Sequence, residues 1–137
     1  MGMHAMVLLA GSGDVPCAVA ALAGRLRVSE DHLSKVMQRL ARAGLVRSAR
    51  GRCGGFLLAR PGDCITFLEV LEAIDGPAAA RTCLLPQPVC DGTSCLLGSL
   101  LARVNEQVLQ SLGGTTLADV QGAAWCRCDR TSDEAKG

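Results

Sequence analysis

Three cysteines lie close together in the second half of the chain and could bind a metal. They are Cys83, Cys90 and Cys95, separated by six and then four residues. Because they belong to one segment, their thiols can converge without bringing distant parts of the chain together. The intervals are longer than the C-x-x-C pairs of structural zinc fingers and suit a larger group, such as an iron-sulfur cluster. The spacing therefore predicts a metal or iron-sulfur site.

Whether cysteines form disulfides or take part in metal or redox chemistry depends on the cellular compartment. The sequence opens without a positively charged leader and has no apolar run approaching the roughly 18 residues that cross a bilayer. We therefore expect a cytoplasmic protein with no membrane partner. Its eight cysteines then favour metal or redox chemistry over disulfides, because the cytoplasm keeps thiols reduced. Cys126 and Cys128 form an isolated C-x-C pair that is a weaker candidate for a further ligand or a redox pair. No role is assigned to Cys17, Cys53 and Cys64, whose apolar or glycine neighbours favour small buried side chains.

A long helix follows the three cysteines and must position the last of them. Ser94 is the predicted N-cap of this helix, which runs to Leu112. Cys95 then lies at the positive end of the helix dipole, which favours the thiolate form that binds metal. The helix carries a continuous apolar stripe that needs a partner surface. This stripe consists of Leu97, Leu100, Leu101, Val104, Val108 and Leu112.

The composition favours packed helices and argues against several classes of function. Of the 137 residues, 49% are hydrophobic, which is enough to bury a real core. Only two phenylalanines, one tryptophan and no tyrosine are present, so we do not expect a platform of stacked rings for single-stranded nucleic acid. With two histidines, no paired carboxylate motif and no phosphate-binding glycine loop, we do not expect an enzyme.

The first half of the chain has the order of elements of a winged helix-turn-helix. A short helix over residues 19–26 precedes a second helix, which Ser29 caps and which ends near Ala43, before Gly44. This second helix is amphipathic and has a basic outer face. Two short strands, 45–50 and 56–59, follow around a glycine-rich loop and form the wing. The predicted fold is thus mainly α with a small β-hairpin wing.

The charge of this unit predicts a double-stranded DNA partner. Residues 25–60 hold nine lysines and arginines against only Glu30 and Asp31. A basic helix face can also be merely solvated, but the adjoining basic hairpin favours DNA. In this fold the second helix enters the major groove and the wing reaches phosphates or the minor groove. The candidate DNA-binding residues are Ser29, Asp31, His32, Ser34, Lys35, Gln38, Arg39, Arg50 and Arg52.

Two further helices complete the predicted DNA-binding unit. The first covers residues 3–10 and ends at Gly11-Ser12-Gly13. The other opens with a capping box formed by Thr66 and Glu69 and runs to Ile74, before Gly76-Pro77. The predicted domains are therefore a DNA-binding domain over residues 1–76 and, over 77–137, the cysteine segment, the long helix and the tail.

From Met3 to about Val120 the sequence resembles the Rrf2 family of dimeric winged-helix regulators. Members of this family regulate iron-sulfur cluster assembly or repress in response to nitric oxide. The resemblance rests on the three cysteines and on the segments Leu40–Gly51, Gly54–Pro61, Ile65–Gly76 and Thr116–Val120.

The resemblance implies a transcription regulator, most typically a repressor, that binds palindromic operators as a homodimer. The helix from Ser94 to Leu112 would cross its twin and so cover the apolar stripe. In cluster-bearing members, cysteines matching Cys83, Cys90 and Cys95 hold a 2Fe-2S or 4Fe-4S cluster whose state sets DNA affinity. The chain would then sense redox state, nitric oxide or iron.

The chain departs from the family pattern in its cysteine spacing and in its fourth ligand. The family intervals are commonly five and five residues, whereas here they are six and four. The assembly regulator has a histidine three residues after its third cysteine, and here that position is Gly98. In other members the fourth ligand comes from the partner's first helix, which makes His4 the candidate ligand here.

Two alternatives to a cluster sensor remain open at this point. One is a cluster-free regulator that is switched by a thiol, a small molecule or a protein partner. The other is a DNA-binding module in which the three cysteines and a fourth ligand hold zinc permanently.

Overall fold

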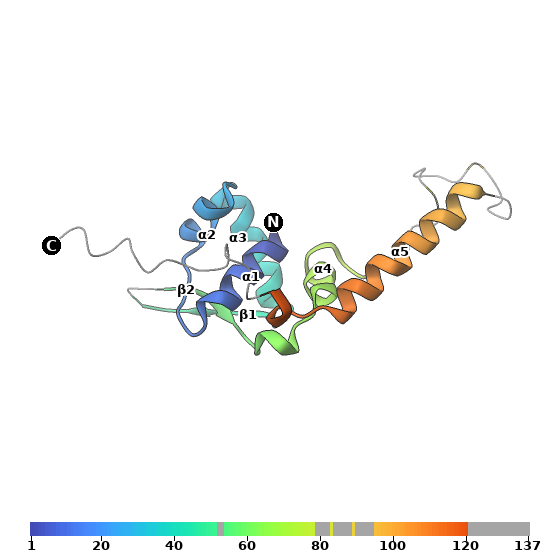
Figure 1. The fold of residues 1–137 in the computed structure, drawn as a ribbon. Coiled ribbons are helices and arrows are strands. Elements are labelled where there is room, and N and C mark those ends of the chain that lie inside the picture. The colour runs from blue at the N-terminus through green and yellow to red at the C-terminus, as the bar shows by residue number, and fades with distance from the viewer. Residues whose placement is uncertain (52–53, 79–82, 84–88, 90–94, 121–137) are drawn as a thin grey trace.

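The computed structural model describes residues 1–51, 54–78, 83, 89 and 95–120. Figure 1 shows most of the helices and the hairpin gathered in one body, from which the long helix labelled α5 extends. None of the helices in these described ranges is both long and apolar enough to cross a membrane. The elements are the helices α1 (Gly2–Ser12), α2 (Val19–Leu26), α3 (Glu30–Arg42), α4 (Phe67–Asp75) and α5 (Leu96–Gly114), the strands β1 (Val46–Ala49) and β2 (Gly55–Leu58), and the one-turn 3-10 helices η1 (Gly62–Cys64) and η2 (Ala118–Val120).

The core is aliphatic and is centred on α1. This helix is apolar on nearly all sides, so it is buried between its neighbours rather than lying on the surface. It extends to Ser12, past the predicted end at Ala10, because Gly13 with a φ of 61° supplies the break. The largest fully buried side chains of the core are Met6, Leu8, Leu9, Leu22, Leu33, Met37, Leu40, Ile65, Val70 and Leu117.

Short-range signals determine both ends of α3. The hydroxyl of Ser29 accepts the N–H of His32 at 3.4 Å, which confirms the predicted N-cap. At the other end Gly44 has a φ of 74°, and the N–H of Leu45 donates to the carbonyl of Leu40 at 3.0 Å. The turn before α3 contains Arg27, the only described non-glycine residue with a positive φ, at 53°. These caps hold α2 and α3 in the helix-turn-helix arrangement.

The predicted hairpin is confirmed, and it has a third backbone partner. β1 and β2 pair antiparallel, with Val46 opposite Leu58. On the other side of β2, Phe56 and Cys17 exchange two backbone hydrogen bonds of 2.9 and 3.0 Å. The loop between α1 and α2 therefore fixes the wing. A Cβ added to Gly55 would lie 2.4 Å from the carbonyl carbon of Cys17, so this close approach requires glycine.

Two of the cysteines to which no role is assigned can be compared with their predicted burial. Cys17 is buried, as its apolar neighbours indicated. The expectation of a buried Cys64 is wrong, since this residue ends the surface turn η1 and is exposed. A hydrogen bond with Asp63 and the negative charge of that residue raise the pKa of the Cys64 thiol, which disfavours its nucleophilic form.

The start of α4 is joined to the end of the wing. Thr66 and Glu69 form the predicted capping box, in which each side chain bonds the backbone N–H of the other residue. The same Glu69 carboxylate accepts from Arg60 at 2.8 Å, just after β2. The Arg60 guanidinium, followed by the Thr66 backbone N–H, lowers the pKa of Glu69. This carboxylate thus links two elements through one side chain.

The start and the end of α5 differ from expectation. Its N-cap is Cys95 itself rather than Ser94, which lies outside the described residues. After Gly114 the chain returns to the body, where the N–H of Phe67 donates to Thr115 and that of Leu117 donates to Ile65, both at 3.0 Å. Leu117 is fully buried in the core of the first unit. The boundary between residues 76 and 77 stays a prediction, but residues 115–117 pack with the elements before it.

Candidate nucleic-acid interface

One side of α3 is apolar and buried, and the opposite side presents a polar row. Asp31, Lys35, Gln38 and Arg42 recur at spacings of four, three and four residues and are all exposed. Such spacing places them along one line of the helix. Arg42 was not among the predicted DNA-binding residues, although the same periodicity could have identified it. This row can meet a groove or a phosphate backbone without rearrangement of the core.

The other predicted residues of this helix have more varied surroundings. Ser29 is exposed, but its hydroxyl already serves as the N-cap. His32 is exposed and Ser34 is half-buried. The guanidinium of Arg39 is exposed but donates to the carbonyl of Ile74 at 2.8 Å. This contact supplies a hydrogen-bond donor to one of the last carbonyls of α4. It gives Arg39 a structural role in addition to its predicted contact with DNA.

Of the two predicted DNA-binding residues of the wing, one lies within the described part of the chain. Arg50 is exposed directly after β1, beside Gly51, whose φ of 128° begins the turn. The predicted Arg52 lies outside the described residues. The turn is closed by the N–H of Gly54, which donates to the carbonyl of Gly51 at 3.0 Å.

The predicted metal ligands are described only in part. Cys83 and Cys95 are half-buried free thiols, and Cys90 lies outside the described residues. The sulfur of Cys95 accepts the N–H of Gly98 at 3.2 Å, at the first turn of α5. His4 lies exposed on α1. Within the described ranges no group of three or more His, Cys, Asp or Glu side chains forms a metal site, so the ligand set stays a prediction.

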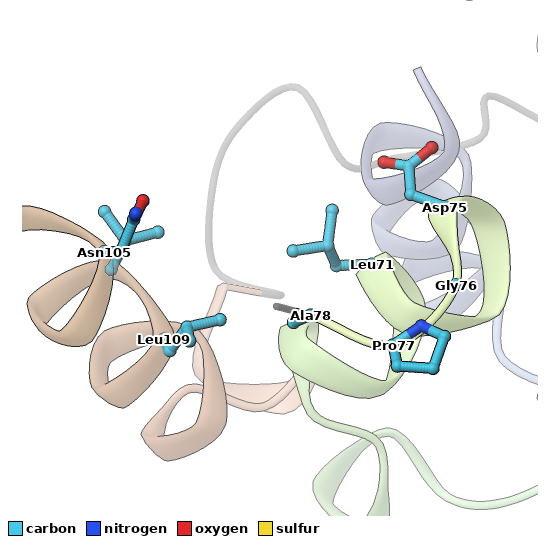
Figure 2. Close-up of a pocket in the computed structure, with 8 residues that line it drawn as sticks. Leu71, Asp75, Gly76, Pro77, Ala78, Asn105 and Leu109 are labelled. Atoms are coloured by element: carbon cyan, nitrogen blue, oxygen red, sulfur yellow. The ribbon is translucent and has the colours of Figure 1, made fainter. Parts of the chain in front are cut away.

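The apolar stripe of α5 is exposed. The side chains of Leu97, Leu100, Val104 and Val108 retain 48–53% of their accessible surface. Figure 2 shows the base of this helix, where the side chain of Leu109 points toward Leu71 of α4 and Ala78 in the segment after it. An open groove of about 360 Å³ lies between these two helices. The exposed apolar surface therefore extends along α5 to its junction with α4.

Comparison with known proteins places this geometry in a family. Residues 1–123 match the model of the Rrf2 family, which is described as an iron-dependent transcriptional regulator. The HTH-type transcriptional regulator IscR of Yersinia pestis is 31% identical over 109 residues, which are 80% of this chain. The chain spans 66% of the length of that relative. The HTH-type transcriptional regulator CymR of Bacillus subtilis is 30% identical over 120 residues, which are 87% of this chain and 83% of CymR.

Solved structures agree with the sequence comparison. The structure of B. subtilis CymR, described as the global cysteine regulator, has a TM-score of 0.71 and 29% identity, and the match covers 88% of this chain and 89% of CymR. The T. potens IscR structure has a TM-score of 0.67 and 28% identity, and the match covers 87% of this chain and 79% of IscR. These relatives are named as transcriptional regulators and not as enzymes. The chain therefore belongs to the Rrf2 family of transcriptional regulators, and its fold is the winged helix of that family.

Proposed function

We propose that the chain is a dimeric transcription regulator that binds double-stranded DNA and is switched by an iron-sulfur cluster on its cysteine segment. The observation that carries the DNA-binding part is the exposed row on α3 together with the exposed Arg50 of the wing. Lys35 and Arg42 supply positive charge along the helix, and Arg50 supplies it at the wing. Asp31 and Gln38 lie in the same row, where the carboxylate can accept hydrogen bonds from base edges and the amide can both donate and accept them.

The dimer is proposed from the exposed stripe of α5. Four large aliphatic side chains about half exposed on one helix are a surface that another apolar surface would cover. A second copy presents the same stripe, and a two-fold pairing of the two helices would be self-complementary. A symmetric dimer would carry two α3 helices and so suit an operator with two related half-sites.

The cluster is proposed from the chemistry of the cysteine donors. Thiolates are soft ligands that bind iron-sulfur clusters and zinc. Cys95 begins α5 with its sulfur at the positive end of the helix, and Cys83 is a free thiol before it. Cys83, Cys90 and Cys95 would hold the cluster, with His4 as the candidate fourth ligand. Such a cluster would supply a redox-sensitive or nitric-oxide-sensitive centre.

Two hydrogen bonds within the chain connect the start of the cysteine segment to α3 through α4. Arg39 ties α3 to the last turn of α4 through the carbonyl of Ile74. Two residues after Gly76 ends α4, the N–H of Ala78 donates to Glu72 at 3.3 Å. A conformational change that begins after Ala78 would therefore act on the last turn of α4, to which Arg39 is hydrogen-bonded.

The alternative is a cluster-free regulator switched by a thiol, a small molecule or a protein partner. It is supported by the likeness to CymR, the global cysteine regulator, at 29% identity. Permanent zinc on the same cysteines is the other alternative.

The DNA-binding part is tested with Lys35→Ala and Arg50→Ala. The probe is a duplex selected from random sequences by the wild-type protein, and fluorescence anisotropy is measured over a range of salt concentrations. Each variant should bind about tenfold more weakly, and each lost phosphate contact should lower the slope of log K against log salt by about 1. The control is Arg103→Ala on α5, which should bind as the wild type does. Unchanged affinity in both test variants would show that this face of α3 and the wing does not bind the DNA.

The cluster is tested by purifying the protein without oxygen and assaying iron, acid-labile sulfide and zinc per chain. We expect iron with sulfide in the wild type and its loss in Cys90→Ala. Cys64→Ala, which removes an exposed thiol outside the proposed set, is the control and should keep the iron. Zinc alone would support the permanent zinc site. An absence of metal would leave the cluster-free regulator.

A further inference from the structure

A second hollow in the molecule lies away from α3 and α5. It is lined by the end of α1, the turn after it, the two strands of the hairpin and the turn before η1. Its volume is about 430 Å³, within the roughly 300–1,000 Å³ of small-molecule sites. No residue of the exposed row of α3 or of the apolar stripe of α5 lines it. Neither the proposed DNA binding nor the proposed dimerisation therefore accounts for this hollow.

Two opposite charges line this hollow, and neither is paired within the described part of the chain. They are the carboxylate of Asp14 and the guanidinium of Arg47, both on exposed residues. A second guanidinium, that of Arg60, also lines the hollow but already donates to Glu69 at 2.8 Å. Asp14 and Arg47 thus keep their hydrogen-bonding capacity for another molecule.

The backbone adds to the negative side of the hollow. α1 ends at Ser12, and Gly13 and Asp14 directly follow it at the rim. The carbonyl end of a helix carries partial negative charge, which favours a cation beside it. Asp14 and the end of α1 together therefore form a site suited to an ammonium group.

The other residues that line the hollow have apolar side chains or are glycines. Leu57, which is 6% exposed, and Leu58 come from β2, and Pro61 comes from the turn after it. A ligand that satisfies the whole hollow thus needs an ammonium group for Asp14, a carboxylate for Arg47 and a small apolar group that branches off beside the two charges. Arg47 can bind a carboxylate with two parallel hydrogen bonds.

We propose that this hollow binds a free α-amino acid in its zwitterionic form. The ammonium lies against Asp14, the carboxylate against Arg47, and the side chain against Leu57 and Leu58. A simple anion would leave Asp14 unpaired, and a simple amine would leave Arg47 unpaired, so both should bind more weakly. The site goes beyond the proposed function, since it needs neither DNA nor metal.

The test is calorimetric titration of the full chain, without DNA, with each standard L-amino acid in turn. The tightest binder is then compared with its N-acetyl derivative, its amide and acetate. We expect at least one amino acid to bind, and each compound lacking one charge to bind about tenfold more weakly. Asp14→Asn and Arg47→Gln should each reduce affinity by a similar factor. The control variants Asp63→Asn and Arg103→Gln change exposed charges that do not line the hollow and should leave the affinity unchanged.

Three results would overturn the proposal. These are the absence of binding by every amino acid, equal binding by the singly charged compounds, and unchanged affinity in both Asp14→Asn and Arg47→Gln. Thermal unfolding of each variant would show that it is folded. Because the titration contains no DNA, a failure to bind amino acids would not bear on the proposed DNA-binding face of α3. Failure of DNA binding would equally leave a positive titration standing.

Discussion

Changing Leu100 and Val104 together to glutamate is expected to convert the proposed dimer into a monomer and to weaken operator binding by about 100-fold or more. Both side chains are 48% exposed on α5, in the middle of the apolar stripe. Two carboxylates at these positions would each lose their hydration in the interface and would face their counterparts across a two-fold axis. Light scattering coupled to size exclusion measures the mass, and anisotropy with the selected duplex measures the affinity.

The size of the effect on DNA binding follows from the two half-sites. A dimer that engages one half-site holds its second α3 next to the other, so the second contact forms at high effective concentration. A monomer loses this advantage while every contact of its own α3 remains intact. The control is Arg103→Glu, which changes the net charge by the same amount on α5 but lies off the stripe. If the double variant remains a dimer, the stripe is not the subunit interface.

Features of the fold set by neighbouring residues could be predicted from the sequence. The N-cap Ser29, the capping box of Thr66 and Glu69, and the stop at Gly44 each need only three or four residues to act. The hairpin likewise follows from two short apolar runs around glycines. These local signals were sufficient for the order of elements, and this order identifies the winged helix.

Features that depend on contacts between distant segments could not be predicted. Nothing in the sequence around Cys17 indicates that its backbone pairs with Phe56. The burial of Leu117 in the core depends on the return of the chain after α5. Cys95 was not expected as an N-cap because cysteine is not among the residues that usually take that position.

The candidate site shows the same division. Periodicity correctly separated the buried and exposed sides of α3, which positions Lys35 and Gln38 on the surface. It could not identify the carbonyl of Ile74 as the partner of Arg39, because that partner lies 35 residues away in the sequence. Arg39 therefore serves in holding α3 to α4, whatever further contact it makes with DNA.

Replacing Gly55 with alanine is expected to lower the free energy of unfolding by about 3 kcal/mol. The new Cβ would lie 2.4 Å from both the carbonyl carbon and the carbonyl oxygen of Cys17. Both atoms belong to the backbone, so no side chain can turn aside to relieve the overlap. The strands must separate, and the two hydrogen bonds between Cys17 and Phe56 are lost with them. Urea unfolding followed by circular dichroism measures the change.

Gly24→Ala provides the matched control with the opposite sign. Gly24 lies inside α2 and has no neighbouring atom within 4 Å of an added Cβ, so alanine there should stabilise the helix by up to about 1 kcal/mol. If Gly55→Ala proves as stable as the wild type, the contact between the first loop and the wing does not hold the hairpin. If it is destabilised as expected, DNA binding should fall at temperatures where the protein remains folded, because the backbone that carries Arg50 is then no longer fixed to α1 and α2.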